Sequence, residues 1–152
     1  MSISWFYCMM NRIRRIARLS SREKIWLWRS WWLLLGFWIA VRTMPFPRVA
    51  QWAQRGSDGA RKHAGGQTQL IFENLSRCVD AARRVHWLPM QCLERSLTTQ
   101  RLLTTEGISA ELRIGVGREG STISAHAWLE LDGTPLEEPR TIGERYLPLV
   151  TQ

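Results

Sequence analysis

The chain has 152 residues, of which 45% are hydrophobic, a length that suits one globular domain with its own core and is short for two. Its three cysteines are widely separated and odd in number, which excludes a disulfide framework and favours a reducing, cytoplasmic setting. The net charge of +8 is confined to residues 1–48, which hold nine Arg or Lys against the single acid Glu23, whereas residues 49–152 hold twelve of each sign. A nucleic-acid-binding domain would spread its basic residues over a folded face, so we expect no nucleic-acid partner and an attached basic segment instead.

The basic segment comes first. Residues 11–19 place Ile13, Ile16 and Ala17 at helical spacing among four arginines, a pattern typical either of a short basic amphipathic helix or of a solvated terminus. Composition then divides the chain into three parts: a basic N-terminal segment over 1–21, a tryptophan-rich helix and loop over 22–66, and a core over 67–152.

Residues 24–42 carry five of the nine tryptophans and predict a long helix. Their uninterrupted apolar run, 30–41, is twelve residues long, whereas a spanning helix needs about 20. Five apolar side chains share one stripe and predict burial against the domain or a partner, with interfacial membrane contact as an alternative: Trp28, Trp31, Trp32, Leu35 and Ile39. Residues 56–66 are glycine-rich and predict an exposed loop.

Two further helices are predicted before the chain changes its period. The first covers residues 69–85 and carries Cys78 on its apolar stripe, which favours a buried structural thiol. The second covers residues 90–106 and ends before Gly107, a residue type typical of the position after a helix. Cys92 falls in the first turn of this second helix.

After these helices the apolar residues alternate. Residues 110–116 and 123–131 have the period of two that predicts strands, with a turn at 117–120 between them. Asp-Gly at 132–133 predicts a second tight turn, followed by a short third strand through Leu136. We therefore expect an α+β domain in which N-terminal helices precede an antiparallel sheet.

Cys92 is the candidate nucleophile. A free thiol is mostly protonated at neutral pH, and the N-terminus of a helix is a position that favours its ionised form. The unpaired N–H groups of a first helical turn also suit the oxyanion of a tetrahedral intermediate. We expect the Cys92 backbone N–H to serve as such a donor, together with the side chain of Gln91.

His126 is the candidate base. In the strand TISAHAWLEL the aliphatic side chains take one face, while Ser124, His126, Trp128 and Glu130 take the other. Trp128 is expected to line the substrate cleft or to be a partly buried residue of the sheet. Arg95, one turn after the cysteine, is expected to form a structural ion pair.

An acid that orients the imidazole completes such an arrangement. A three-residue loop at 132–134 would place Glu138 on the face of His126, whereas a two-residue loop would place Glu137 there. Asp132 is expected to be a turn residue. The cysteines and histidines lack paired metal-ligand spacing, so we expect neither a metal nor a cofactor.

Two segments, QCLERSLTTQRLLTTEGISAELRIGV and AHAWLELDGTPLEE, resemble the stand-alone leader peptidases of lasso peptide biosynthesis, the peptidase half of the split B protein. The resemblance is close over residues 92–138 and looser over the tryptophan-rich helix. It implies a transglutaminase-like (papain-like) cysteine protease core in which Cys92 attacks a peptide bond and His126 activates it. An acid twelve residues beyond the histidine would orient it. That position holds Glu138 where the family has Asp, so Glu137 stays a rival.

The resemblance also implies a setting. The substrate would be the precursor of a ribosomally synthesised peptide, presented by a separate leader-recognition protein and closed afterwards by an ATP-dependent lasso macrolactam synthetase. This maturation would take place in the cytoplasm, with peripheral membrane contact through the N-terminal segment as a further expectation. The alternatives are a non-catalytic scaffold or membrane-docking partner, and a transglutaminase or acetyltransferase on the same fold.

Overall fold

The structure is a computed structural model of the whole chain and describes residues 20–56, 65–119, 122–136, 139 and 141–151. The basic segment predicted over 11–19 lies outside these residues. Helices come first and a four-stranded antiparallel sheet follows, which confirms the predicted α+β class. In chain order the elements are α2 (Ser21–Thr43), α3 (Phe46–Gln54), α4 (Gly65–Val85), α5 (Cys92–Thr105), β1 (Glu111–Glu119), β2 (Thr122–Leu131), β3 (Thr134–Pro135), α6 (Ile142–Arg145) and β4 (Tyr146–Thr151).

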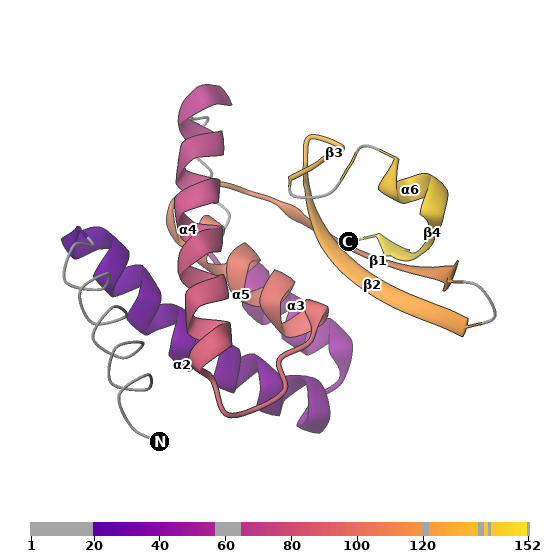
Figure 1. Cartoon of the computed structure of the whole chain (residues 1–152), viewed down its shortest axis with the longest axis horizontal. Helices are drawn as coiled ribbons and strands as arrows, with labels where there is room; N and C mark the ends of the chain where they lie inside the picture. The colour runs from indigo at the N-terminus through magenta and orange to yellow at the C-terminus, as the bar shows by residue number, and fades with distance from the viewer. Residues whose placement is uncertain (1–19, 57–64, 120–121, 137–138, 140, 152) are drawn as a thin grey trace, which may run out of the picture.

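Helices α2 to α5 lie together on one side of the sheet, and α6 lies beside the strands at the C-terminal end of the chain (Figure 1). α5 is the central helix, since it contacts α2, α3 and α4 as well as strands β1 and β2. Three of its leucines, Leu97, Leu102 and Leu103, are fully buried. The helix that carries Cys92 is therefore held on several sides by the rest of the domain.

α2 begins with a capping box. The hydroxyl of Ser20 accepts a hydrogen bond from the Glu23 N–H (3.2 Å), and the Glu23 carboxylate accepts one from the Ser20 N–H (2.8 Å). The helix ends at Thr43, just before Pro45, which caps the start of α3. Among the described residues, no helix has both the length and the apolar character that crossing a membrane requires.

The buried face of α2 differs from the predicted one. Trp28, Trp32 and Ile39 are 65%, 50% and 47% exposed, so their burial against the domain was a wrong prediction, whereas Trp31 of the same stripe is partly buried against the core. The face that enters the core instead holds Trp26, Ser30, Leu34, Phe37 and Ala40. Because the helix is apolar on nearly every side, hydropathy did not distinguish the two faces. The small Ser30 and the indole N–H of Trp26, which donates to the C-cap residue of α5, Glu106 (2.9 Å for Nε1 to Oε1), mark the inner one.

α5 ends as predicted. The N–H of Ile108 donates to the Leu103 carbonyl (2.9 Å), and the N–H of Gly107 donates to the Thr104 carbonyl (3.0 Å). Gly107 has φ +78°, so these bonds form a Schellman motif, which needs a residue in the left-handed region after the last turn. The end of the helix fixes where β1 can begin.

The sheet has the order β3-β2-β1-β4. β1 and β2 form the predicted hairpin, although β1 continues through Gly117 to Glu119. Leu131 pairs with Thr134, so the loop between β2 and β3 has two residues. Its residues, Asp132 and Gly133, both have positive φ (49° and 74°), as a type I′ turn requires. The predicted turn role of Asp132 is confirmed. Of the two loop lengths that the sequence left open, two or three residues, the pairing of β2 with β3 shows the shorter one.

Candidate active site

Cys92 is the first residue of α5. Gln91 precedes it as the helix N-cap in an extended conformation (φ −86°, ψ 178°). The thiol is half-buried and free, and it lies at the end of the helix where backbone N–H groups lack intrahelical partners. The structure thus places the cysteine at the helix N-terminus, as the sequence predicts.

The imidazole of His126 packs against two aromatic side chains that also contact each other. Its ring centroid is 6.2 Å from that of Trp128, with 16° between the planes, and 5.4 Å from that of Tyr146. Trp128 and Tyr146 are only 4% and 8% exposed and belong with Ile142 to a small cluster of their own. The face of β2 expected to be polar is therefore partly covered by the segment that follows β3.

Gly115 makes room for this aromatic cluster. It pairs with His126 across the β1-β2 ladder, and a Cβ built on it would lie 2.8 Å from the Cβ of Tyr146 and 3.0 Å from the Trp128 ring. Any side chain at this position would displace one of the two aromatic rings. Sequence reasoning missed Tyr146 and strand β4, although glycines at 115 and 117 in a strand are a signal that bulky groups approach closely.

One cavity, of about 470 Å³, brings the predicted residues together. Cys92, His126 and Trp128 all line it. The sequence left two roles open for Trp128, and it has both: it is a buried residue of the sheet and it lines the cavity. Its indole N–H donates to Glu130 (3.0 Å for Nε1 to Oε1), whose other carboxylate oxygen accepts from Arg113 Nε (2.9 Å). These bonds fix the plane of the indole beside the imidazole.

A direct bond joins the helix of the cysteine to the strand of the histidine. The buried hydroxyl of Ser96, one helical turn after Cys92, donates to the carbonyl of Ala127, the residue after His126 (3.0 Å). Further along α5, the side-chain amide of Gln100 donates to the Ala110 carbonyl (2.9 Å). Two buried polar contacts therefore set the position of the helix against the sheet.

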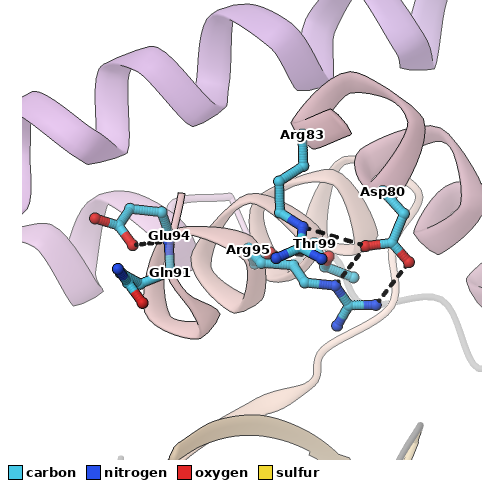
Figure 2. Close-up of polar contacts among 6 residues, drawn as sticks. All are labelled: Asp80, Arg83, Gln91, Glu94, Arg95 and Thr99. Carbon is cyan, nitrogen blue, oxygen red and sulfur yellow. Dashed lines mark hydrogen bonds and ion pairs between the residues drawn. The ribbon is translucent and has the colours of Figure 1, made fainter. Parts of the chain in front are cut away.

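An ion pair forms the charged wall of the cavity. Arg95 donates to both oxygens of Asp80 (2.7 Å from Nε and 3.1 Å from Nη2), and Arg83 Nε lies 3.9 Å from the same carboxylate (Figure 2). Burial would raise the pKa of Asp80, but the hydrogen bond and charge of Arg95, with the charges of Arg83 and Arg84, hold this pKa below its usual range. The ion-pairing prediction for Arg95 is confirmed, and its partner Asp80 was not foreseen.

A second network fixes the first turn of α5. The buried carboxylate of Glu94 accepts from the Gln91 backbone N–H (3.0 Å; Figure 2) and from Arg42 Nη1 of α2 (2.9 Å). Arg42 also donates to the Trp38 carbonyl and lies over the Trp38 ring, 4.2 Å from its centroid. Because Glu94 uses the Gln91 N–H, an oxyanion role for Gln91 depends on its exposed side-chain amide.

We expect Arg42→Met to lower the free energy of unfolding by about 2–3 kcal/mol, because it leaves the Glu94 carboxylate buried without its cation. Urea denaturation measures this loss. Arg48→Met on the exposed side of α3 is the matched control and should cost less than about 0.5 kcal/mol. Equal stability of the two variants would show that the buried carboxylate does not depend on Arg42.

The cysteines should differ in reactivity. Cys78 is 5% exposed, and burial raises its pKa to about 11, so only about one thiol in several thousand is ionised at pH 7.5. The prediction of a buried structural thiol is confirmed. Iodoacetamide at pH 7.5, followed by peptide mapping, should label Cys92 quickly and Cys78 only in denaturant. Faster labelling of Cys78 than of Cys92 in the folded protein would contradict this assignment.

The two acids proposed to orient the imidazole, Glu138 and Glu137, lie outside the described residues. The last described bond between the strands runs from the Leu136 N–H to the Leu129 carbonyl (3.0 Å). The orienting acid therefore stays a prediction.

A thiol at the start of a central helix, sharing a cavity with a histidine on the neighbouring antiparallel strand, is the arrangement of papain-like thiol enzymes. The comparison with known families agrees, since residues 31–151 match the transglutaminase-like superfamily, and the chain belongs to it. Members of this superfamily are commonly cysteine peptidases or acyltransferases. No curated protein and no solved structure matches the chain.

Proposed function

We propose that this protein is a cysteine peptidase that removes the leader peptide from a ribosomally synthesised lasso peptide precursor before the macrolactam forms. The observation that carries the peptidase assignment is that Cys92 and His126 line one cavity within a transglutaminase-like domain. The leader-removing role is supported by the sequence resemblance over residues 92–138.

The proposed chemistry is acyl transfer in two steps. His126 takes the proton of the Cys92 thiol, the thiolate attacks the scissile carbonyl carbon, and the Cys92 N–H with the Gln91 side chain stabilises the resulting oxyanion. The C–N bond breaks, His126 gives a proton to the departing amine, and a thioester remains on the sulfur. Water, deprotonated by His126, then attacks the thioester, which releases the carboxylic acid and restores the thiol.

The shape of the site supports a peptide substrate. A second cavity of about 480 Å³ runs beside α4 and shares three lining residues with the first: Phe72, Asp80 and Leu136. The two cavities thus adjoin, and the second lies along α4 on the side away from Cys92. An extended chain would reach both cavities, whereas a compact metabolite would occupy one.

The proposed partners are the precursor peptide, a separate leader-recognition protein and an ATP-dependent macrolactam synthetase. Two other functions use the same chain differently. A non-catalytic scaffold would need no reactive thiol, and a transglutaminase or acetyltransferase would pass the acyl group to an amine or another acceptor instead of water.

The masses of the products distinguish these functions. The purified protein is incubated with a synthetic precursor peptide, with and without the leader-recognition protein, and the products are weighed by mass spectrometry. Two fragments whose masses sum to that of the precursor plus one water indicate hydrolysis. A product joined to an amine with loss of ammonia indicates transglutamination. Unchanged precursor under both conditions would exclude the proposed peptidase.

A further inference from the structure

The outer side of α2 exposes large apolar side chains in one row. Ile25, Trp28 and Trp32 are 56%, 65% and 50% exposed and follow one another at spacings of three and four. Trp28 and Trp32 contact each other edge to face, with 5.8 Å between ring centroids. An aromatic row of this kind is unusual on a solvated surface and marks an interaction site.

The row continues onto the connection between α4 and α5. Trp31 packs against Trp32 (4.9 Å between centroids) and stacks on His86 (4.8 Å). His86 therefore lies against α2, and its two chain neighbours, Val85 and Trp87, are 56% and 80% exposed. We name the exposed set the aromatic face; it comprises Ile25, Trp28, Trp32, Val85 and Trp87.

The charges around the aromatic face are basic. Lys24 and Arg29 lie one turn before Trp28 and Trp32 on α2, and Arg84 is exposed in the last turn of α4. The one acid of α2, Glu23, forms the capping box with Ser20. The face therefore joins indole rings to cations, a combination that favours an anionic and partly apolar partner.

We propose that the aromatic face docks the protein on a bilayer that contains anionic lipids, with α2 lying along the surface. Tryptophan side chains favour the boundary between head groups and acyl chains, and basic residues beside them attract anionic head groups. A fluid bilayer accepts a protruding row of indoles without a matching pocket. The two cavities of the active site have no lining residue on α2, so docking leaves them uncovered.

Vesicle sedimentation of the full chain tests the proposal. The protein should sediment with vesicles of phosphatidylglycerol and phosphatidylcholine, and much less with phosphatidylcholine alone. The triple variant Trp28→Ser, Trp32→Ser, Trp87→Ser should reduce the partition coefficient by about tenfold or more, because each indole would bury on the order of 150 Å² or more at the interface. Lys24→Glu with Arg29→Glu should weaken binding and reduce its dependence on salt.

The matched control replaces three comparably exposed apolar residues on strands at the other side of the molecule: Ile123→Ser, Leu147→Ser and Leu149→Ser. This control should sediment like the wild type, and the aromatic-face variant should keep its thermal unfolding temperature. Equal sedimentation of the aromatic-face variant and the wild type would overturn the proposal. So would failure of the wild type to bind anionic vesicles, or light scattering that shows the face buried between two copies of the chain.

Discussion

Cys92→Ala should abolish removal of the leader peptide and leave the fold intact. The substitution takes away the sulfur that would form the thioester, and loss of the nucleophile in comparable triads lowers kcat by about 10⁴-fold or more. The side chain is half-buried at the first position of α5 and packs against the main core without being one of its buried residues, so the free energy of unfolding should change by less than about 1 kcal/mol. Chromatography of the reaction mixture and urea denaturation measure the two effects.

Cys78→Ala is the matched control for this experiment. Cys78 lies in the main core, so its replacement should cost stability, on the order of 1 kcal/mol, but leave cleavage intact. The Cys92 variant should therefore lose cleavage and keep its stability, whereas the Cys78 variant should lose stability and keep cleavage. Normal cleavage by the Cys92 variant would remove the peptidase proposal and favour a scaffold.

The sequence predicted the elements whose signals are local. The apolar period of α5 and Gly107 after it predicted the helix that starts with Cys92. The alternation through residues 123–131 and Asp-Gly at 132–133 likewise predicted the hairpin that carries His126. In each case the side chains that define the element lie within a few residues of one another, so the element can be predicted from a single sequence.

The parts that were missed depend on contacts between distant segments. Arg42 and Glu94 are 52 residues apart, and nothing in the sequence indicates that they pair. Strand β4 was not predicted because Tyr146 packs on His126 across β1, and only the order of strands in the sheet creates that contact. The inner face of α2 was misassigned for the same reason, since its neighbours and not its own hydropathy select the buried side.

Glu137→Gln should lower kcat/KM for leader removal by about 10²- to 10⁴-fold, whereas Glu138→Gln should change it by less than about threefold. The loop between β2 and β3 has two residues, and a loop of that length is the case in which the sequence predicts Glu137, and not Glu138, on the face of His126. Replacing the carboxylate by an amide removes the charge that would stabilise the imidazolium while keeping the size of the side chain. Steady-state kinetics with the precursor peptide measure both variants.

An acid that works through the imidazole has no effect once the imidazole is gone. His126→Ala should itself reduce cleavage severely, and adding Glu137→Gln to it should reduce cleavage no further, because the two residues act as one unit. Additive losses in the double variant would mean that Glu137 contacts the substrate or supports the fold instead. A large loss in Glu138→Gln with little change in Glu137→Gln would favour the position twelve residues beyond the histidine, and would require an irregularity in the chain after Leu136 that shifts the alternation by one residue.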